Sequence, residues 1–385
     1  MKRSLPLAAL ALLAAAPPPV PGPGYAPRDA DERGLWMQVD EEERALKTSN
    51  FLIRDPGFNA YVRKVFCRTV GEVCRDVRIY IVRTPYFNAS MAPNGMMLVW
   101  SGLFLRTRDE AQLAAVLGHE FTHYRERHSL QGFRDIKKKT NAMAWLSMIP
   151  VGGYAAAGAM TTLQVGMIGS IFSFSREMES AADAGSVGLL AKAGYDPRAA
   201  SRIWAQIRAE DLATAAQRGR KARREGGMFA THPTSAARQA ALDRQAAALS
   251  GPSDRALNAA EYRAALAPFW ADFIDDQIKL NDFGATELLL EQLAGANGWT
   301  GDLLYARGEL YRARGGPGDF ILASGYYCQA IAAGGAPVEA WRGLGLALLR
   351  AGDKPGGQAA LASYLARSPA AKDRPMVAML AGVTP

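Results

Sequence analysis

Two histidines and a glutamate form the stretch of this chain best suited to chemistry, His119-Glu120-x-x-His123. Residues four positions apart on an α-helix lie on the same face, so the two imidazoles can bind one ion. Catalytic Zn²⁺ sites use such nitrogen ligands with a third protein ligand and keep the fourth position for water. Glu120 would be the base toward that water. The spacing therefore predicts a hydrolytic site with one Zn²⁺ per chain.

A helix must present these side chains, and the residues before them predict one. Thr107 and Glu110 have the spacing of a capping box. Leu113, Val116, Leu117 and Glu120 then follow at three- and four-residue spacing. The alternative is a pair of histidines on a polar helix surface. The chain has only 4 histidines, and two of them fall at ligand spacing on an otherwise apolar helix, which favours the metal site.

A second acidic pair lies further along the chain. Glu179 and Asp183 share one face of a helix predicted to open at Arg176. One carboxylate on zinc and one hydrogen-bonded to a ligand imidazole is the arrangement that a stable site needs. The alternative is a solvated helix face. The neighbouring alanines 181, 182 and 184 favour close helix packing, where carboxylates without partners would be costly.

Composition indicates a globular chain with room for a sizeable core. With 385 residues, 49% of them hydrophobic, it is predicted to form two domains. The net charge of +8 comes from scattered basic residues without a recognition module. We therefore expect no nucleic-acid partner. Peripheral contact with anionic membrane surfaces, or solubility alone, accounts better for this charge.

The first 24 residues have the form of a secretory signal followed by the start of a Pro/Gly linker. A basic start precedes an apolar run from Leu5 to Ala16 that is too short to span a bilayer. We therefore expect export. In an oxidising compartment Cys67 and Cys74 either form a disulfide or stay as buried free thiols, and Cys328 is left over.

A small sheet is predicted before the motif helix, with strands at Val77–Val82 and Met96–Trp100. An exposed edge strand beside a zinc site can bind an extended peptide through main-chain hydrogen bonds. The alternative is an ordinary hairpin strand. The residues expected to form the substrate-binding edge are Gly95, Met96, Met97 and Leu98.

Two further features follow the motif. His128 lies five residues after His123, a spacing that would rotate it off the metal-facing side of a continuous helix, so we expect it at the surface. From Thr140 to Ser175 there is no charged residue. That segment either forms a buried or partly exposed helical hairpin or enters a membrane.

The motifs together resemble the gluzincin metallopeptidases of peptidase family M48, the group that includes HtpX-type and CAAX prenyl proteases. The likeness covers roughly residues 35–245. It implies an α+β, mainly α, metallopeptidase domain with a small sheet, closest to exported, soluble members with a helical-repeat tail. The motifs that carry it are the histidine stretch, Glu179-x-x-x-Asp183, Ala193–Pro197 and Thr231-His232-Pro233, preceded by Asn88-Ala89, Gly95 and Ser101–Leu103.

The resemblance also implies roles for single residues and a setting for the chain. His119, His123 and Glu179 would be the zinc ligands, Glu120 the general base, and Asp183 a partner of the ligands. His232 and Arg238 would lie near the cleft and donate to the substrate carbonyl or oxyanion. In some members the loop histidine instead caps the metal. The family further implies protein or peptide substrates from the envelope and a periplasmic location.

The composition changes near residue 250, so we predict a metallopeptidase domain at 25–250 and a helical tail at 251–385. In the tail a pattern recurs after 37 positions and fits tetratricopeptide-like helix pairs, which stack to form a groove. A generic α-hairpin extension is the alternative. The matching positions are Gly308, Tyr311, Gly315 and Tyr327 with Gly345, Leu348, Gly352 and Tyr364.

These features predict a zinc-dependent endopeptidase that hydrolyses envelope proteins in quality control or outer-membrane assembly. The tail would recruit protein substrates or dock on the envelope assembly machinery. The alternative is a largely self-inhibited protein-binding quality-control or chaperone factor that works through its helical repeats.

Overall fold

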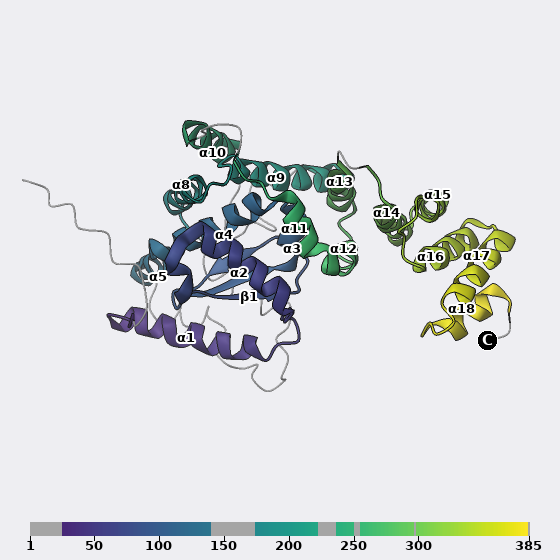
Figure 1. Cartoon of the computed structure of the whole chain (residues 1–385), viewed down its shortest axis with the longest axis horizontal. Helices are drawn as coiled ribbons and strands as arrows, with labels where there is room; N and C mark the ends of the chain where they lie inside the picture. The colour runs from purple at the N-terminus through teal and green to yellow at the C-terminus, as the bar shows by residue number, and fades with distance from the viewer. Residues whose placement is uncertain (1–24, 140–173, 222–235, 250–254, 296–297, 384–385) are drawn as a thin grey trace, which may run out of the picture.

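A computed structural model describes residues 25–139, 174–221, 236–249, 255–295 and 298–383. Figure 1 shows a mostly helical chain with one small sheet, which confirms the predicted α+β, mainly α, class. Within the described ranges no helix is both long and apolar enough to cross a membrane. The predictions for the signal segment, for residues 140–173 and for His232 lie outside these ranges.

The sheet contains three strands, β1 (Arg78–Val82), β2 (Ala89–Met91) and β3 (Met96–Trp100). Their order is β1-β3-β2, with β1 parallel and β2 antiparallel to β3. Alternate residues of β3 enter two different cores, because successive side chains of a strand point to opposite faces. Helix α1 (Ala30–Lys47) covers one face, and α2 (Pro56–Val70) with α4 (Glu110–Arg125) covers the other.

The central position of β3 contradicts one prediction. Gly95 to Leu98 were expected to form an exposed edge, but β3 has a neighbour on each side and all five of its residues are buried. The three-residue strand β2 is too short for a clear pattern of its own, and it occupies the edge beside α4. Gly95 serves the turn instead: its φ is 86°, and an added Cβ would lie 2.8 Å from the carbonyl oxygen of Asp76.

Aspartate side chains cap the two N-terminal helices. Helix α2 begins at Pro56, and the side chain of Asp55 accepts a hydrogen bond from the backbone N–H of Phe58 at 2.8 Å. Helix α1 begins at Ala30, and the side chain of Asp29 caps it by accepting a hydrogen bond from the backbone N–H of Glu32 at 3.0 Å. Cys67 and Cys74 form a disulfide, which resolves the two alternatives and ties α2 to the 3₁₀ helix Gly71–Asp76.

The predicted capping box was misplaced by two residues. Asp109 caps α4, where its carboxylate accepts from the backbone N–H of Gln112 at 2.7 Å. The Gln112 side chain reaches back to the N–H of Arg108 at 2.7 Å. Thr107 instead ends the short helix α3 (Ser101–Arg106), and its hydroxyl donates to the carbonyl of Leu103.

The core around α4 continues past residue 250. Arg106 donates through Nε to Glu210 at 2.8 Å and through Nη2 to Gln277 at 3.1 Å, and the Arg106–Glu210 pair has no exposed side-chain surface. Tyr262 and Phe273 belong to the same apolar cluster as α4. We therefore propose a boundary near residue 298 in place of 250. The helices joined in this way are α9 (Ala199–Gln217), α11 (Ala259–Leu266), α12 (Trp270–Ile278) and α13 (Phe283–Ala294).

The remaining helices form hairpins that extend to one side of the molecule (Figure 1). The repeated glycines occupy equivalent contacts: an added Cβ would lie 2.7 Å from Tyr327 at Gly308 and 2.6 Å from Leu361 at Gly345. This pairing is compatible with tetratricopeptide-like units. The helices are α14 (Gly301–Arg314), α15 (Asp319–Ala333), α16 (Glu339–Ala351), α17 (Lys354–Arg367) and α18 (Arg374–Ala381).

Candidate metal centre

Helix α4 carries the motif residues inside the protein. His119, Glu120 and His123 are 2%, 3% and 1% exposed, so the predicted polar-surface alternative does not apply. Apolar residues surround them on the same helix, and the Phe174 ring stacks on His123 with centroids 3.9 Å apart. Burial of two imidazoles and a carboxylate is costly unless they are paired or coordinate a metal.

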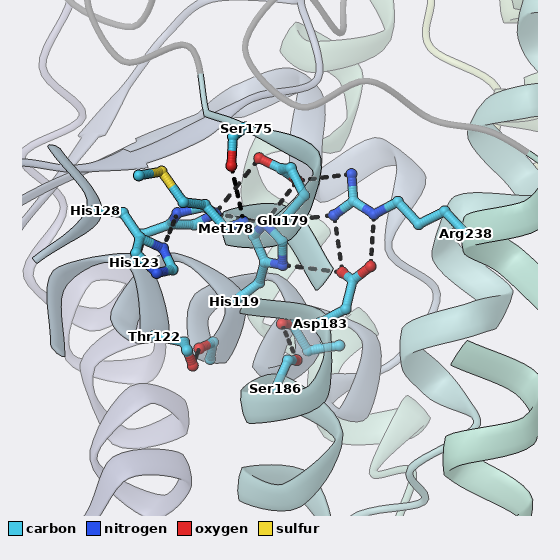
Figure 2. A network of polar contacts seen from close by, with 12 residues as sticks. His119, Thr122, His123, His128, Ser175, Met178, Glu179, Asp183, Ser186 and Arg238 are labelled. Carbon is cyan, nitrogen blue, oxygen red and sulfur yellow. Dashed lines mark hydrogen bonds and ion pairs between the residues drawn. The ribbon is translucent and has the colours of Figure 1, made fainter. Parts of the chain in front are cut away.

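Helix α8 (Arg176–Lys192) packs beside α4 and carries the acidic pair. The hydroxyl of Ser175 caps it by accepting from the backbone N–H of Met178 at 3.3 Å. Glu179 and Asp183 are each 4% exposed and face α4, as their four-residue spacing predicts (Figure 2). The favourable N-terminal end of the helix dipole lies at Glu179.

Three donor atoms converge where the two helices meet. The Nε2 atoms of His119 and His123 are 3.1 Å apart, and the Glu179 carboxylate oxygens lie 3.5 Å from the first and 3.6 Å from the second. Ligands about 2.0–2.1 Å from a tetrahedral Zn²⁺ are about 3.3 Å from one another. The triangle therefore has the size of one face of a zinc tetrahedron. Within the residues that the structure describes, these three side chains form the cluster that could hold a metal ion.

Each imidazole uses its other nitrogen for a polar partner. Nδ1 of His119 lies 3.1 Å from Oδ1 of Asp183, and Nδ1 of His123 lies 2.9 Å from Nδ1 of His128 (Figure 2). Partners of this kind fix the ring orientation and the tautomer of metal ligands. Both rings are therefore held so that Nε2 faces the common point.

His128 contradicts the prediction that it lies at the surface, because it is only 5% exposed. The expected rotation assumed a continuous helix. Helix α4 ends at Arg125, Arg127 adopts φ 60°, and α5 (His128–Lys139) starts in a new direction. This left-handed residue turns the chain back, so that His128 reaches the ring of His123.

Arg238 on α10 (Ala236–Leu249) contacts both carboxylates of α8. Its Nε and Nη2 donate to Asp183 at 2.6 and 2.8 Å, and Nη1 lies 2.8 Å from Oε2 of Glu179. The guanidinium also lies over the ring of Trp204 on α9, 4.4 Å from its centroid. The family resemblance implied that Arg238 lies near the cleft. In the structure its side chain contacts the proposed ligand Glu179 and Asp183, the partner of His119.

These neighbours determine the protonation of the site. Burial opposes the charged form of His119, but hydrogen bonds and charges of Asp183 and Glu179 outweigh it and raise its pKa to about 9. Burial would raise the pKa of Asp183, but Arg238 and His119 lower it overall. A zinc ligand must be a neutral imidazole, so a proton and a metal ion compete for His119.

Small residues allow α4 and α8 to approach this closely. A Cβ added at Gly185 would lie 2.5 Å from the side chain of Thr122. The hydroxyl of Ser186 donates across the interface to the carbonyl of Ala115 at 2.6 Å. Contact between the helices one turn from the donor atoms therefore sets the distance from Glu179 to the histidines.

With this geometry established, the protein-family model "Peptidase family M48" matches residues 58–246. Residues 58–246 form an M48 peptidase domain. The match contains α4, α8 and Arg238, so every side chain of the centre described above falls inside it. The M48 resemblance noted from the motifs is thereby confirmed.

Curated relatives of this M48 domain are similar at 25–28% identity in two bacteria. Beta-barrel assembly-enhancing protease of Escherichia coli is 28% identical over 180 residues, 43% of this chain and 36% of that protein. The same-named protein of Yersinia pestis is 25% identical over 234 residues, 56% of this chain and 46% of its own length. Mitochondrial metalloendopeptidase OMA1 of Schizosaccharomyces pombe is 29% identical over 154 residues, 39% of this chain and 44% of the relative. The aligned part is less than half of each of these relatives.

Sequence reasoning did not identify three residues of the M48 site. Phe174 stacks on His123, Trp204 supports Arg238, and His128 contacts His123. The two aromatic residues have no spacing that separates them from ordinary core residues. Only His128 carried a usable signal, as one of the chain's 4 histidines.

Proposed function

We propose that this chain is a zinc-dependent endopeptidase that hydrolyses peptide bonds of protein substrates. The observation that carries the proposal is the triangle of donor atoms from His119, His123 and Glu179, with edges of 3.1, 3.5 and 3.6 Å. These three residues would hold one Zn²⁺. When bound, Zn²⁺ acts as a Lewis acid that polarises a carbonyl and lowers the pKa of water to about 7.

Glu120 supplies the general base in this proposal. It follows His119 on α4 and is 3% exposed, so it lies buried beside the proposed ligands. Its carboxylate takes a proton from the attacking water and later delivers it to the leaving amine as the C–N bond breaks. The negative charge of Glu120 is one of the causes that raise the pKa of Arg238. Glu120 therefore interacts electrostatically with the arginine that contacts Glu179 and Asp183.

Arg238 and Asp183 act on the ligands in this scheme. Asp183 orients His119 through Nδ1, and Arg238 positions both Asp183 and Glu179. Formal charges support the assignment: Glu120, Glu179 and Asp183 carry one negative charge each, which Zn²⁺ and one arginine would balance. His232, also expected near the cleft, keeps its proposed role as a donor to the substrate oxyanion.

The proposed setting is the periplasm, with substrates among envelope proteins. Two relatives are named for enhancing β-barrel assembly, and the third is named a metalloendopeptidase. From the name of the two bacterial relatives we propose that this chain acts in outer-membrane protein assembly or quality control. The helical tail would engage protein partners there.

Hydrolysis of unfolded casein, measured with wild type and Glu120→Gln, tests this function. Glu120→Gln removes the base but none of the proposed ligands, so we expect zinc to be retained and kcat to fall by about 100-fold or more. Wild-type casein hydrolysis that resists a zinc chelator, or a Glu120→Gln variant with full activity, would contradict the proposal.

A further inference from the structure

A groove of about 690 Å³ lies between α12, which belongs to the core that contains α4, and the first helices of the tail; no residue of the metal centre lines it. Helices α12 and α14 form its walls, and the turn between α15 and α16 closes one end. These helices are labelled in Figure 1. Its volume is in the range of sites that take small ligands or short peptide segments. Apolar side chains form the base of the groove, with Ile274, Ile278 and Ala306 buried and Trp270 and Tyr305 partly exposed.

The rim of this groove is acidic, although the chain carries a net charge of +8. None of the lining residues is Lys or Arg. Asp272 pairs with Arg83, Asp275 with Lys279 and Glu309 with Arg312, whereas Asp302 and Glu339 form no ion pair with any residue that the structure describes. The carboxylates that line the groove are Asp272, Asp275, Asp302, Glu309 and Glu339.

The hydroxyl of Tyr305 lies in the groove among charges of both signs. Burial is the main cause that raises its pKa; the charges of Glu309 and Glu339 raise it further, and those of Arg342 and Arg312 oppose the rise. The groove therefore combines an apolar base with two rim carboxylates, Asp302 and Glu339, that have no ion-pair partner among the described residues. Basic side chains of a ligand would pair with these carboxylates, and acidic ones would be repelled by them.

We propose that the groove binds a short basic segment of a partner protein, an extended stretch in which Lys or Arg side chains alternate with apolar ones. The basic side chains would pair with Asp302 and Glu339 at the rim, and the apolar ones would contact Trp270 and Ile274. Stacked helical pairs present concave surfaces suited to such segments. The inference goes beyond peptidase activity, because this binding involves no residue of the metal centre.

Fluorescence polarisation tests the binding with the full chain. The chain carries Glu120→Gln, which prevents cleavage, and is loaded with zinc. The probe is a labelled peptide of about nine residues in which lysine alternates with apolar residues, and a matched peptide carries glutamate in place of lysine. We expect the lysine peptide to bind more tightly, and its affinity to fall as salt is raised from about 50 to about 300 mM.

Two charge-neutralising variants localise the contact. Asp302→Asn combined with Glu339→Gln should weaken binding of the lysine peptide about tenfold or more. Glu72→Gln combined with Glu261→Gln removes the same charge from two exposed positions outside the groove and should stay within about twofold of the parent. Glu339→Lys, a single change at a partly exposed position, is an independent variant with the same expected loss as the first.

Equal affinity of the groove variants and the parent would overturn the proposal, as would equal binding of the glutamate peptide. Because the readout is binding by a cleavage-deficient chain, failure here leaves the peptidase proposal intact. Loss of casein hydrolysis would likewise leave the groove inference intact.

Discussion

The guanidinium of Arg238 lies 2.8 Å from Oε2 of Glu179, so an arginine contacts the carboxylate that we assign as the third zinc ligand. Through Nε the same guanidinium holds Asp183 at 2.6 Å, and Asp183 in turn contacts His119. A residue on α10 thus connects two of the three ligands. The bidentate arrangement restrains both carboxylates of α8, and the ring of Trp204 supports the arginine from behind.

Replacing Arg238 should weaken zinc binding. Arg238→Gln removes the restraint on Glu179 and Asp183, and loss of such partners typically costs about 10–100-fold in metal affinity. Arg238→Lys should not restore the affinity, because an ammonium cannot make the same bidentate contact. Competition with a chromogenic chelator measures the zinc Kd. Arg244→Gln, at an exposed position of the same helix, is the control and should leave the Kd unchanged.

Unchanged zinc affinity in Arg238→Gln would favour the role first predicted for Arg238, that of a donor to the substrate carbonyl or oxyanion. If Arg238→Gln kept its zinc affinity and lost only kcat, the arginine would act on the substrate oxyanion and not on the ligands. The zinc Kd therefore separates a positioning residue from an oxyanion donor.

Enlarging Gly185 should separate α4 from α8. A Cβ at this position would lie 2.5 Å from the Thr122 side chain, so Gly185→Ala should lower the free energy of unfolding by about 1–3 kcal/mol and weaken zinc binding. Urea unfolding and chelator competition measure the two effects. Gly188→Ala is the matched control on α8, because a Cβ there has nothing within 4 Å. It should be neutral or stabilising by up to about 1 kcal/mol.

Trimming the opposing side chain provides the converse test. Thr122→Ala removes the atoms nearest to the added methyl group, so the double variant should recover part of the stability lost in Gly185→Ala. Purely additive losses would contradict the packing explanation.

Glu43 should make stability depend on pH below neutrality. Burial opposes its ionisation, but hydrogen bonds from Arg78 and Tyr80 outweigh this and lower its pKa from 4.5 to about 2. The contribution is therefore complete above about pH 5 and is lost as the pH falls toward 2. We expect Glu43→Gln to cost about 2 kcal/mol at pH 7 and about 1 kcal/mol less at pH 3.5, measured by urea unfolding. A cost that does not change with pH would refute this assignment.

The position of a truncation should decide whether the peptidase domain folds. A chain ending at residue 250 lacks Tyr262, Leu266, Phe273 and Leu289, all buried in the core that contains α4. Full burial of each such side chain contributes about 1.5–3 kcal/mol, so their loss approaches the whole stability of a domain. A chain ending at residue 298 keeps them and should bind zinc and hydrolyse unstructured casein. Circular dichroism and metal analysis compare the two, and a folded chain ending at 250 would contradict the proposed boundary.

The site illustrates what helical spacing can and cannot predict. His119 with His123, and Glu179 with Asp183, are each four residues apart, so each pair was assigned to one helix face. That the two faces meet requires the α4–α8 packing, and only the chemistry of the residues pointed to it. His128 was misplaced because a helix was extended through Arg127, whose φ of 60° breaks it. No residue type in that segment signals a left-handed turn as glycine would.

The sheet shows a similar limit. The β-rich run Met96–Trp100 was recognised as a strand, and the structure gives it the same bounds. Its neighbours are set by pairing across the sheet, which composition does not encode. The partner β2 has only 3 residues, so the centre of the sheet was taken for its edge. In the tail, the 37-residue recurrence has a physical basis, because Gly308 and Gly345 each leave room for a large side chain of the next helix.

Zinc stoichiometry of purified wild type, Glu179→Ala and Glu177→Ala tests the central claim most directly. Glu177 is an exposed residue two positions earlier on the same helix, so its variant controls for any change made to α8. We predict about one zinc per chain in wild type and in Glu177→Ala, and almost none in Glu179→Ala. Full zinc occupancy in Glu179→Ala would contradict the assignment of the metal centre and the hydrolytic function built on it.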